Sequence, residues 1–214
     1  KKFNPGLILE IGSNDGAFIS NFNKRSVIGV EPCKNLANLT IKKGFKIFPN
    51  YWNQTLAKKI AKKNKIDLIY SANTLSHIED LDEIFNAIDL ALTENGILIL
   101  EDPSLLECIK NVAYDQFYCE HLYVFSTIAL ERILSKFNLT IFSVENIKTH
   151  GGSNRYYIKR NNNLIYKIDS SVKQNVVKER NFGLHKITTY KAFSKKVIKS
   201  KKSLNKIFND LAKK

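Results

Sequence analysis

The sequence LILEIGSNDG, residues 7–16, decides how the rest of the chain is interpreted. A short apolar run ends in the acid Glu10 and then meets two glycines four residues apart, which is typical of a buried strand followed by a tight turn and the start of a helix. Gly12 can take a positive φ angle and leaves room for a ligand against the backbone, and Gly16 lets the following helix pack closely on the strand. Asn14 stands where dinucleotide-binding folds usually have glycine, and asparagine tolerates left-handed backbone geometry. Taken alone, this pattern fits many α/β proteins.

Length and composition indicate a single α/β domain with a small appendage. The chain has 214 residues, enough for one sizeable core. No apolar run approaches the length of a membrane span, and residues 1–5 lack the apolar segment of a signal peptide, so we expect a cytoplasmic protein with no membrane partner. The three cysteines are odd in number and have no C-x-x-C spacing, which argues against a disulfide framework and against a zinc site.

Charge is distributed unevenly along the chain. Residues 1–154 carry 17 basic and 17 acidic side chains, whereas residues 155–214 carry 17 basic and 3 acidic ones. A basic tail can bind nucleic acid or another polyanion, or it can be the solvated face of a Lys-rich helix. The tail is poor in arginine and glycine and lacks the interleaved aromatic residues of a single-strand binder, so we do not expect nucleic acid as a partner.

Strand-like and helix-like segments alternate along residues 1–160, as in a parallel sheet covered by helices on both faces. The expected strands are 7–11, 26–30, 45–48, 66–71 and 97–101. The expected helices are 17–24, 35–43, a segment ending near 64, 79–92, and one beginning at Ser126 or Thr127. A hairpin-like pair follows at 139–148 and 155–159, and one or two Lys-rich helices follow from about residue 165. These segments predict an α/β domain over residues 1–160, with a mostly parallel sheet and an antiparallel C-terminal hairpin, and a basic helical extension over residues 161–214.

Polar residues follow several of the predicted strands. Glu31 ends the second strand, roughly 20 residues after the first turn, where dinucleotide folds hold ribose hydroxyls. Asn50 and Tyr51 follow the third strand, and an aromatic ring there can flank adenine or simply pack against the loop. The glycine turn and Glu31 together indicate a nucleoside ligand.

Acid–base side chains gather after the fourth and fifth strands. His77 lies in the exit loop of the fourth strand, at the edge of the sheet where α/β proteins bind ligands. Tyr118, Glu120 and His121 lie within four residues of one another beyond the fifth strand. These are the groups that general acid–base catalysis uses, although a polar helix cap would have the same composition.

With these residues identified, the chain resembles a specific group, the class I, Rossmann-like C-methyltransferases that use S-adenosyl-L-methionine (SAM) and act on nucleotide-linked deoxysugars. The resemblance spans essentially the whole sequence. The matching segments are 12–16, 29–32 with Asn35, 72–77, 114–126, and 150–153 with Arg155.

The resemblance implies roles for individual residues. Those expected to bind SAM are Glu10, Gly12, Asn14, Asp15, Gly16, Glu31, Asn50, Tyr51 and Asn73. Those expected to bind the substrate are His150, Gly151, Ser153 and Arg155. Cys119 stands where the family usually has a histidine, which puts the placement of the substrate in question.

The resemblance also implies a reaction. A hydrogen on the carbon next to a ketone is acidic enough for an imidazole to remove, and the resulting enolate attacks the methyl group of SAM. His121 is the expected base, Tyr118 and His77 are expected to position or polarise the keto sugar, and Glu120 is expected to orient a neighbour. No metal is expected in this site.

Members of the resembled family typically carry an N-terminal zinc-binding domain and a C-terminal domain. The chain contains no methionine at all, and the cysteines of the zinc-binding domain are absent. We therefore interpret these residues as a catalytic core with a connecting helical segment, whose partners include the flanking domains of a longer protein.

Three other functions are open to such a sequence. A small-molecule O-methyltransferase needs similar acid–base groups. A nucleic-acid methyltransferase is disfavoured, because the exit of the fourth strand lacks an N-P-P-Y type sequence. A SAM-binding module without activity could dock through its basic tail, but the intact acid–base residues argue against it.

Overall fold

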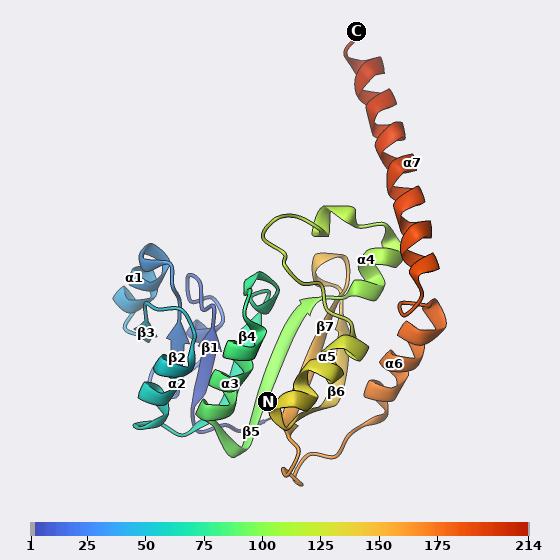
Figure 1. Ribbon diagram of the computed structural model, residues 1–214. Coiled ribbons are helices and arrows are strands. Elements are labelled where there is room, and N and C mark those ends of the chain that lie inside the picture. The colour runs from blue at the N-terminus through green and yellow to red at the C-terminus, as the bar shows by residue number, and fades with distance from the viewer. Residues whose placement is uncertain (1–2, 214) are drawn as a thin grey trace.

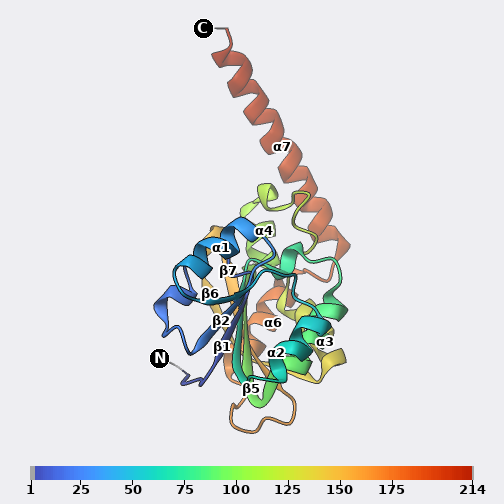
Figure 2. The same ribbon diagram turned by 90° about the vertical axis from the view of Figure 1, so that its left-hand side faces the viewer.

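The computed structural model describes residues 3–213 and contains one seven-stranded sheet flanked by helices (Figures 1 and 2). The strands are β1 (Ile8–Ile11), β2 (Val27–Val30), β3 (Lys46–Phe48), β4 (Ile66–Ala72), β5 (Leu92–Pro103), β6 (Leu139–Ile147) and β7 (Ser153–Arg160). The α-helices are α1 (Lys34–Lys42), α2 (Gln54–Ala61), α3 (Leu81–Ala91), α4 (Leu105–Asn111), α5 (Thr127–Leu134), α6 (Ser170–Phe182) and α7 (Ile187–Leu211). Short 3₁₀ turns are η1 (Ile19–Asn21), η2 (Leu75–His77), η3 (Tyr114–Gln116), η4 (Ser135–Phe137) and η5 (Thr149–Gly151). No helix within residues 3–213 combines the length and the apolar character needed to cross a bilayer.

The strand order is β3-β2-β1-β4-β5-β7-β6. Strands β1 to β5 pair in parallel, and β7 runs antiparallel to both β5 and β6. This arrangement confirms the predicted parallel sheet with an antiparallel C-terminal hairpin. The carboxyl ends of β1, β4 and β5 and the turn before β7 therefore meet at one edge of the sheet, where α/β proteins bind ligands.

Each face of the sheet has its own apolar core. One core includes side chains of α2, α3, α5 and α6, and the other includes side chains of α1 and η1. In the edge-on view of Figure 2, α1 lies on one side of the sheet and α2 and α3 lie on the other. Helix α3 shows why the sequence folds this way, because its residues Leu81, Ile84, Phe85 and Ile88 recur at helical spacing and are all buried.

The helix predicted at residues 17–24 does not form, and only the turn η1 is found there. The side-chain amide of Asn21 donates hydrogen bonds to the carbonyl oxygens of Ala17 and Phe18, both at 2.9 Å. Such local bonds compete with the main-chain bonds of a helix. The chain therefore crosses this face of the sheet with a single short turn.

The fifth strand is also longer than predicted. The sequence predicts a strand that begins at residue 97, but α3 ends at Ala91 and β5 begins directly after it, at Leu92. The pairing with β4 jumps from Leu92 to Ile97, so the intervening residues form an irregularity within the strand. Asn95 and Gly96 therefore belong to the strand.

The C-terminal section forms two helices, within the predicted range of one or two. Helix α6 packs on α5, where the carboxylate of Glu179 accepts hydrogen bonds from the backbone N–H of Thr127 at 2.6 Å and of Ile128 at 3.0 Å. Glu179 is only 1% exposed, and a negative charge at a helix N-terminus is favourable. Ser126 is the N-cap of α5, because its side chain accepts from the N–H of Ala129. Helix α7 has no buried residue and extends away from the body of the molecule (Figure 1).

Candidate active site

The glycine turn, residues 12–16, follows β1 and has left-handed backbone at three positions. The φ angles are 75° at Gly12, 48° at Asn14 and 81° at Gly16, which confirms the geometry predicted for Asn14. A Cβ on Gly12 would approach the Cγ2 atom of Thr74 to 2.8 Å, so the turn packs directly against the exit loop of β4.

Gly16 serves a different helix from the one predicted. A Cβ on Gly16 would approach the Cγ2 atom of Thr40 to 2.6 Å, and Thr40 belongs to α1. The absence of a side chain at Gly16 therefore lets α1 pack against the turn. The expectation that it serves the helix directly after the turn is wrong, because that helix does not form.

Glu31 holds the glycine turn in place. Its carboxylate is buried and accepts hydrogen bonds from the backbone N–H of Asn14 and of Cys33, both at 2.8 Å. The side chain of Asn14 in turn accepts from the N–H of Asp15 at 2.8 Å. Because each carboxylate oxygen has a second lone pair, Glu31 can still accept a bond from a ligand hydroxyl.

Three buried acceptors near the turn have no protein partner among residues 3–213. They are Glu10 Oε2, Ser13 Oγ and Asn73 Oδ1. The pKa of Glu10 is raised to about 8, mainly by burial and in part by the nearby carboxylates of Glu31 and Asp15. Buried polar atoms without partners call for a ligand or water, and acceptors beside clustered carboxylates suit a cationic ligand. SAM carries a sulfonium and an ammonium group, so these residues fit it.

The two residues predicted after β3 are both exposed. Tyr51 is 76% exposed, and the backbone N–H of Asn50 donates to the carbonyl of Phe48 at 2.9 Å. The neighbouring Trp52 is buried in the core. Tyr51 is therefore the aromatic side chain at this strand end that is accessible to a ligand.

The histidine loop, residues 114–123, connects α4 toward α5 and brings the predicted acid–base residues together. The hydroxyl oxygen of Tyr118 lies 3.0 Å from Nε2 of His121. The rings of His121 and His77 have centroids 4.9 Å apart. An exit loop of β4 and a loop following α4 thus place two imidazoles and a phenol side by side.

Backbone carbonyls fix the tautomers of both histidines. Nδ1 of His121 lies 2.8 Å from the carbonyl oxygen of Gln116, and Nδ1 of His77 lies 3.0 Å from the carbonyl oxygen of Glu120. A carbonyl oxygen can only accept, so in the neutral imidazoles Nδ1 carries the proton and Nε2 has the free lone pair. Tyr118 therefore donates its hydroxyl proton to His121.

Glu120 orients the His77 ring through its main chain. Its carbonyl, rather than its carboxylate, accepts the bond from His77, and its side chain is exposed. Cys119 is also exposed and is a free thiol. The two side chains between Tyr118 and His121 thus point to solvent.

The histidine loop is fastened to the exit loop of β4. The carbonyl of Ser76 accepts from the N–H of Leu122 at 2.8 Å and of Tyr123 at 3.2 Å, and the hydroxyl of Tyr123 donates to the carbonyl of Glu79 at 2.8 Å. Sequence reasoning missed these contacts and that of Gln116, because a backbone carbonyl leaves no residue-specific signal.

Asp102 is a further buried acid that the sequence analysis did not select. It lies at the end of β5 and is only 3% exposed. Its pKa is raised to about 7, mainly by burial and in part by the neighbouring Glu101 carboxylate. The sequence signal that could have identified Asp102 is its position beside a second acid, Glu101, at the end of a predicted strand.

The predicted substrate-binding residues do not all share one surface. His150 and Gly151 lie in the turn between β6 and β7, where both have positive φ angles, and the Ser153 hydroxyl donates to the carbonyl of Thr149 at 3.0 Å. Arg155 instead forms an ion pair with Glu101 at 2.8 Å. Arg155 lines a hollow together with Tyr70 and Tyr157, whereas Gly151 and Ser153 line a different one.

Two family models and a curated relative match the chain. A family model described as a methyltransferase domain matches residues 1–144, and one described as a C-methyltransferase C-terminal domain matches residues 148–214. C-methyltransferase NovU of Streptomyces niveus is 31% identical over 150 residues, which are 69% of this chain and 36% of that protein. The chain therefore spans about a third of the length of this curated relative.

Solved structures share the fold. A SAM-dependent methyltransferase from Thermotoga maritima superposes with a TM-score of 0.55 at 20% identity, covering 72% of this chain and 82% of that one. An O-methyltransferase of a multienzyme from Brevibacillus brevis, in complex with S-adenosyl-L-homocysteine, has a TM-score of 0.56 at 14% identity, covering 93% of this chain and 80% of that one.

The chain belongs to the methyltransferase domain family, because that model covers more than half of its residues. This confirms the predicted Rossmann-like methyltransferase, with SAM as its cofactor. The glycine turn, Glu31 and the unpartnered acceptor of Asn73 are the residues that would hold SAM.

Proposed function

We propose that this domain transfers a methyl group from SAM to the carbon next to the ketone of a nucleotide-linked deoxysugar. The observation that carries the proposal is the position of the exit loop of β4. Its Thr74 packs against the glycine turn, and two residues later Ser76 accepts hydrogen bonds from the histidine loop. A methyl donor on the turn and an acid–base pair on the loop would therefore be neighbours. The similarity to a protein named a C-methyltransferase supports carbon as the acceptor.

When bound, SAM supplies an electrophilic methyl group, so the protein's own task is to make the acceptor carbon nucleophilic. Removal of a proton from that carbon leaves an enolate, and the proton must pass to a base within hydrogen-bond reach. The His121 imidazole can be this base, because its Nε2 carries a lone pair and accepts a hydrogen bond from the Tyr118 hydroxyl.

Tyr118 and His121 can act as a pair. In the structure the hydroxyl of Tyr118 donates to Nε2 of His121. When a keto sugar enters, the same hydroxyl can donate to the ketone oxygen instead. That single change polarises the carbonyl and frees Nε2 to take the proton from the adjacent carbon, so Tyr118 stabilises the developing enolate while His121 acts as the base.

His77 has a supporting place in this scheme. Its Nδ1–H is held by the carbonyl of Glu120, which leaves its Nε2 without a partner among residues 3–213. The ring lies beside His121, so it can accept a hydroxyl hydrogen bond from the sugar.

The decisive test is His121→Asn with a keto-deoxysugar nucleotide as substrate. We expect methyl transfer to fall at least about a thousandfold while SAM affinity by calorimetry changes less than about twofold, because the side chain lies outside the glycine turn.

Tyr118→Phe should lower kcat by roughly a hundredfold, because one hydrogen-bond donor to the enolate oxygen is lost.

Proton abstraction can be followed without methyl transfer. In D₂O and without SAM, the wild-type protein should exchange the hydrogen next to the ketone, as seen by NMR, and His121→Asn should not. Unchanged turnover or unchanged exchange in this variant would rule out His121 as the base.

O-methylation is the second candidate, because the Tyr118–His121 pair could equally remove a hydroxyl proton. The two functions differ in their products. A new C-methyl carbon in the NMR spectrum supports the proposal, and a methyl ether supports the alternative. SAM binding without either product would leave a non-catalytic module.

A further inference from the structure

A polar pocket of about 350 Å³ lies beside the turn between β6 and β7. We name it the hairpin pocket. It is lined by Glu107, Asn146, Ile147, Lys148, Gly151, Gly152, Ser153 and Asn154. Its volume is at the small end of the range for ligand sites, and it can accept a small polar group rather than a whole nucleotide sugar.

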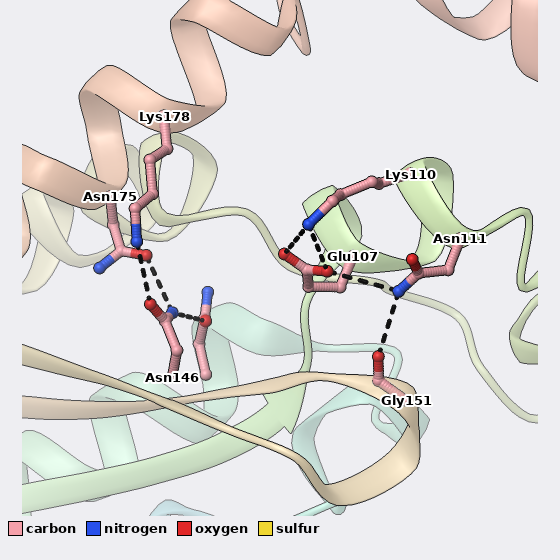
Figure 3. Close-up of polar contacts among 8 residues, drawn as sticks. Glu107, Lys110, Asn111, Asn146, Gly151, Asn175 and Lys178 are labelled. Carbon is pink, nitrogen blue, oxygen red and sulfur yellow. Dashed lines mark hydrogen bonds and ion pairs between the residues drawn. The ribbon is translucent and has the colours of Figure 1, made fainter.

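Polar contacts join the hairpin to α4 and to α6 beside the pocket, as Figure 3 shows. Asn146 on β6 donates hydrogen bonds to the side-chain oxygens of Asn154 at 2.7 Å and Asn175 at 3.0 Å, which joins the hairpin to α6. On α4, the Asn111 amide lies 3.4 Å from the carbonyl oxygen of Gly151. A Cβ on Gly152 would meet the Glu107 side chain at 2.8 Å, so α4 packs closely against the turn.

The charges around the pocket are mostly positive. Lys148 lines it, Lys178 of α6 donates to the neutral oxygen of Asn146 at 3.3 Å, and Lys110 of α4 pairs with Glu107 at 3.3 Å. Within the described part of the chain, Lys148 and Lys178 form no ion pair. Two ammonium groups therefore remain uncompensated beside hydrogen-bonding amides, which is a setting that favours an anion.

The pocket is one helix away from the proposed reaction centre. The N–H of Ser104, just before α4, donates to the carbonyl of Gly152 at 3.0 Å, and the N–H of Leu105 donates to the carbonyl of Phe125 at 2.9 Å. The start of helix α4 is thus tied to the hairpin and to Phe125, two residues beyond the histidine loop. An extended substrate could reach both places across α4.

We propose that the hairpin pocket binds the diphosphate of the nucleotide-linked substrate, with Lys148 and Lys178 as its cations. This proposal rests on the proposed function, which supplies a substrate that carries a diphosphate. Glu107 works against binding, because its carboxylate lies in the same wall and neutralises Lys110.

The test is a binding titration with inorganic pyrophosphate and with UDP, followed by NMR and calorimetry at fixed ionic strength. The combined variant Lys148→Ala and Lys178→Ala should weaken both ligands at least about tenfold, because two charge-assisted contacts are lost. Glu107→Gln should tighten both about threefold, because it removes the opposing charge without changing the size of the side chain.

The matched control is Lys195→Ala with Lys199→Ala, which removes the same charge from the exposed surface of α7. We expect the control to change affinity by less than twofold. Equal losses in the control, or no loss in the pocket variant, would overturn the proposal. Equal affinities for pyrophosphate and UDP would show that the pocket contacts only the phosphates. A higher affinity for UDP would show that the protein also contacts the nucleoside.

The two proposals fail separately. If pyrophosphate and UDP bind as expected but no keto-deoxysugar nucleotide is methylated, the pocket stands and the proposed function fails. If methylation occurs and the pocket variant has an unchanged KM for the sugar nucleotide, the function stands and the pocket assignment fails.

Discussion

The glycine turn and the histidine loop flank the same exit loop of β4, but they are held in place by different means. Left-handed backbone, close packing on Thr74 and Thr40 and the buried Glu31 carboxylate fix the turn. In the histidine loop, Tyr118 is 45% exposed, and a few main-chain carbonyls orient the two imidazoles.

This difference indicates that the glycine turn and the histidine loop have different functions. A turn fixed by its own backbone is preorganised, so it can bind a cofactor with little ordering cost. A loop whose side chains are exposed and held by single hydrogen bonds can exchange one partner for another when a substrate arrives. Changes to the turn should therefore affect cofactor binding and stability, and changes to the loop should affect turnover.

Gly12→Ala should have the largest effect. The new Cβ would overlap Thr74 at a left-handed position, so we expect SAM affinity to fall at least about a hundredfold and the free energy of unfolding to fall by more than 2 kcal/mol, because strain and overpacking add. Calorimetry and thermal unfolding measure the two effects.

The chain offers a matched control for this change. Gly151 has nearly the same φ angle, 76°, but nothing lies within 4 Å of its Cβ position. Gly151→Ala should cost only the left-handed backbone strain of about 1–2 kcal/mol and leave SAM affinity unchanged. Equal effects of the two variants on SAM affinity would show that Thr74 contact does not matter.

Glu31→Gln should weaken SAM binding by about tenfold. The amide keeps the size of the side chain but has one acceptor oxygen instead of two, so it weakens one of the bonds from the N–H groups of Asn14 and Cys33 and loses the other. Glu120→Gln is the counterpart in the histidine loop, where the carboxylate is exposed, and it should change SAM affinity less than twofold. Isothermal calorimetry with SAM on both variants tests this difference. Equal losses of SAM affinity in the two variants would contradict it.

Glu10 should make the stability of the ligand-free turn depend on pH. Its pKa is about 8 in the folded protein and about 4.5 as a free side chain, so between these values the folded state holds a proton that the unfolded chain has lost. The stabilisation from this group is therefore full below pH 4.5 and is lost as the pH rises to about 8. Tm measured from pH 5 to 9 should fall more steeply for wild type than for Glu10→Gln, whereas the exposed Glu94→Gln should follow wild type.

The contrast between turn and loop also explains what could be predicted from the sequence. Gly12, Asn14 and Glu31 act through backbone conformation and a strand-end position, both of which the residue pattern encodes. The grouping of His77 with His121 follows from strand order, and the prediction rested on resemblance rather than on spacing. The contacts of Gln116 and Ser76 could not be predicted, because every residue has a carbonyl.

Prediction of the fold from the sequence has the same limit, because long-range contacts are not visible in local patterns. Alternating apolar segments predicted the sheet and most helices, because periodicity reports burial. The missing helix after the turn depends on the Asn21 amide binding two nearby carbonyls, and the early start of β5 depends on its pairing with β4. Both are decided by contacts that local patterns do not contain.

Phe193→Ala should have the smallest effect and should act on the loop alone. The ring of Phe193 on α7 lies 5.8 Å, centroid to centroid, from the ring of Phe117, which stands between Gln116 and Tyr118. Loss of this contact should speed amide hydrogen exchange across residues 114–121 several-fold and lower turnover a few-fold, while exchange in residues 12–16 stays unchanged. Phe193→Leu should restore most of the protection, because it keeps an apolar contact.

Phe208→Ala, farther along α7 where the ring is 63% exposed, provides the control and should change neither quantity. Exchange in the histidine loop that is identical in Phe193→Ala and wild type would show that the main-chain bonds to Ser76 hold the loop without help from α7. Faster exchange confined to the histidine loop would instead establish that the contact from α7 stabilises this loop and does not affect the glycine turn.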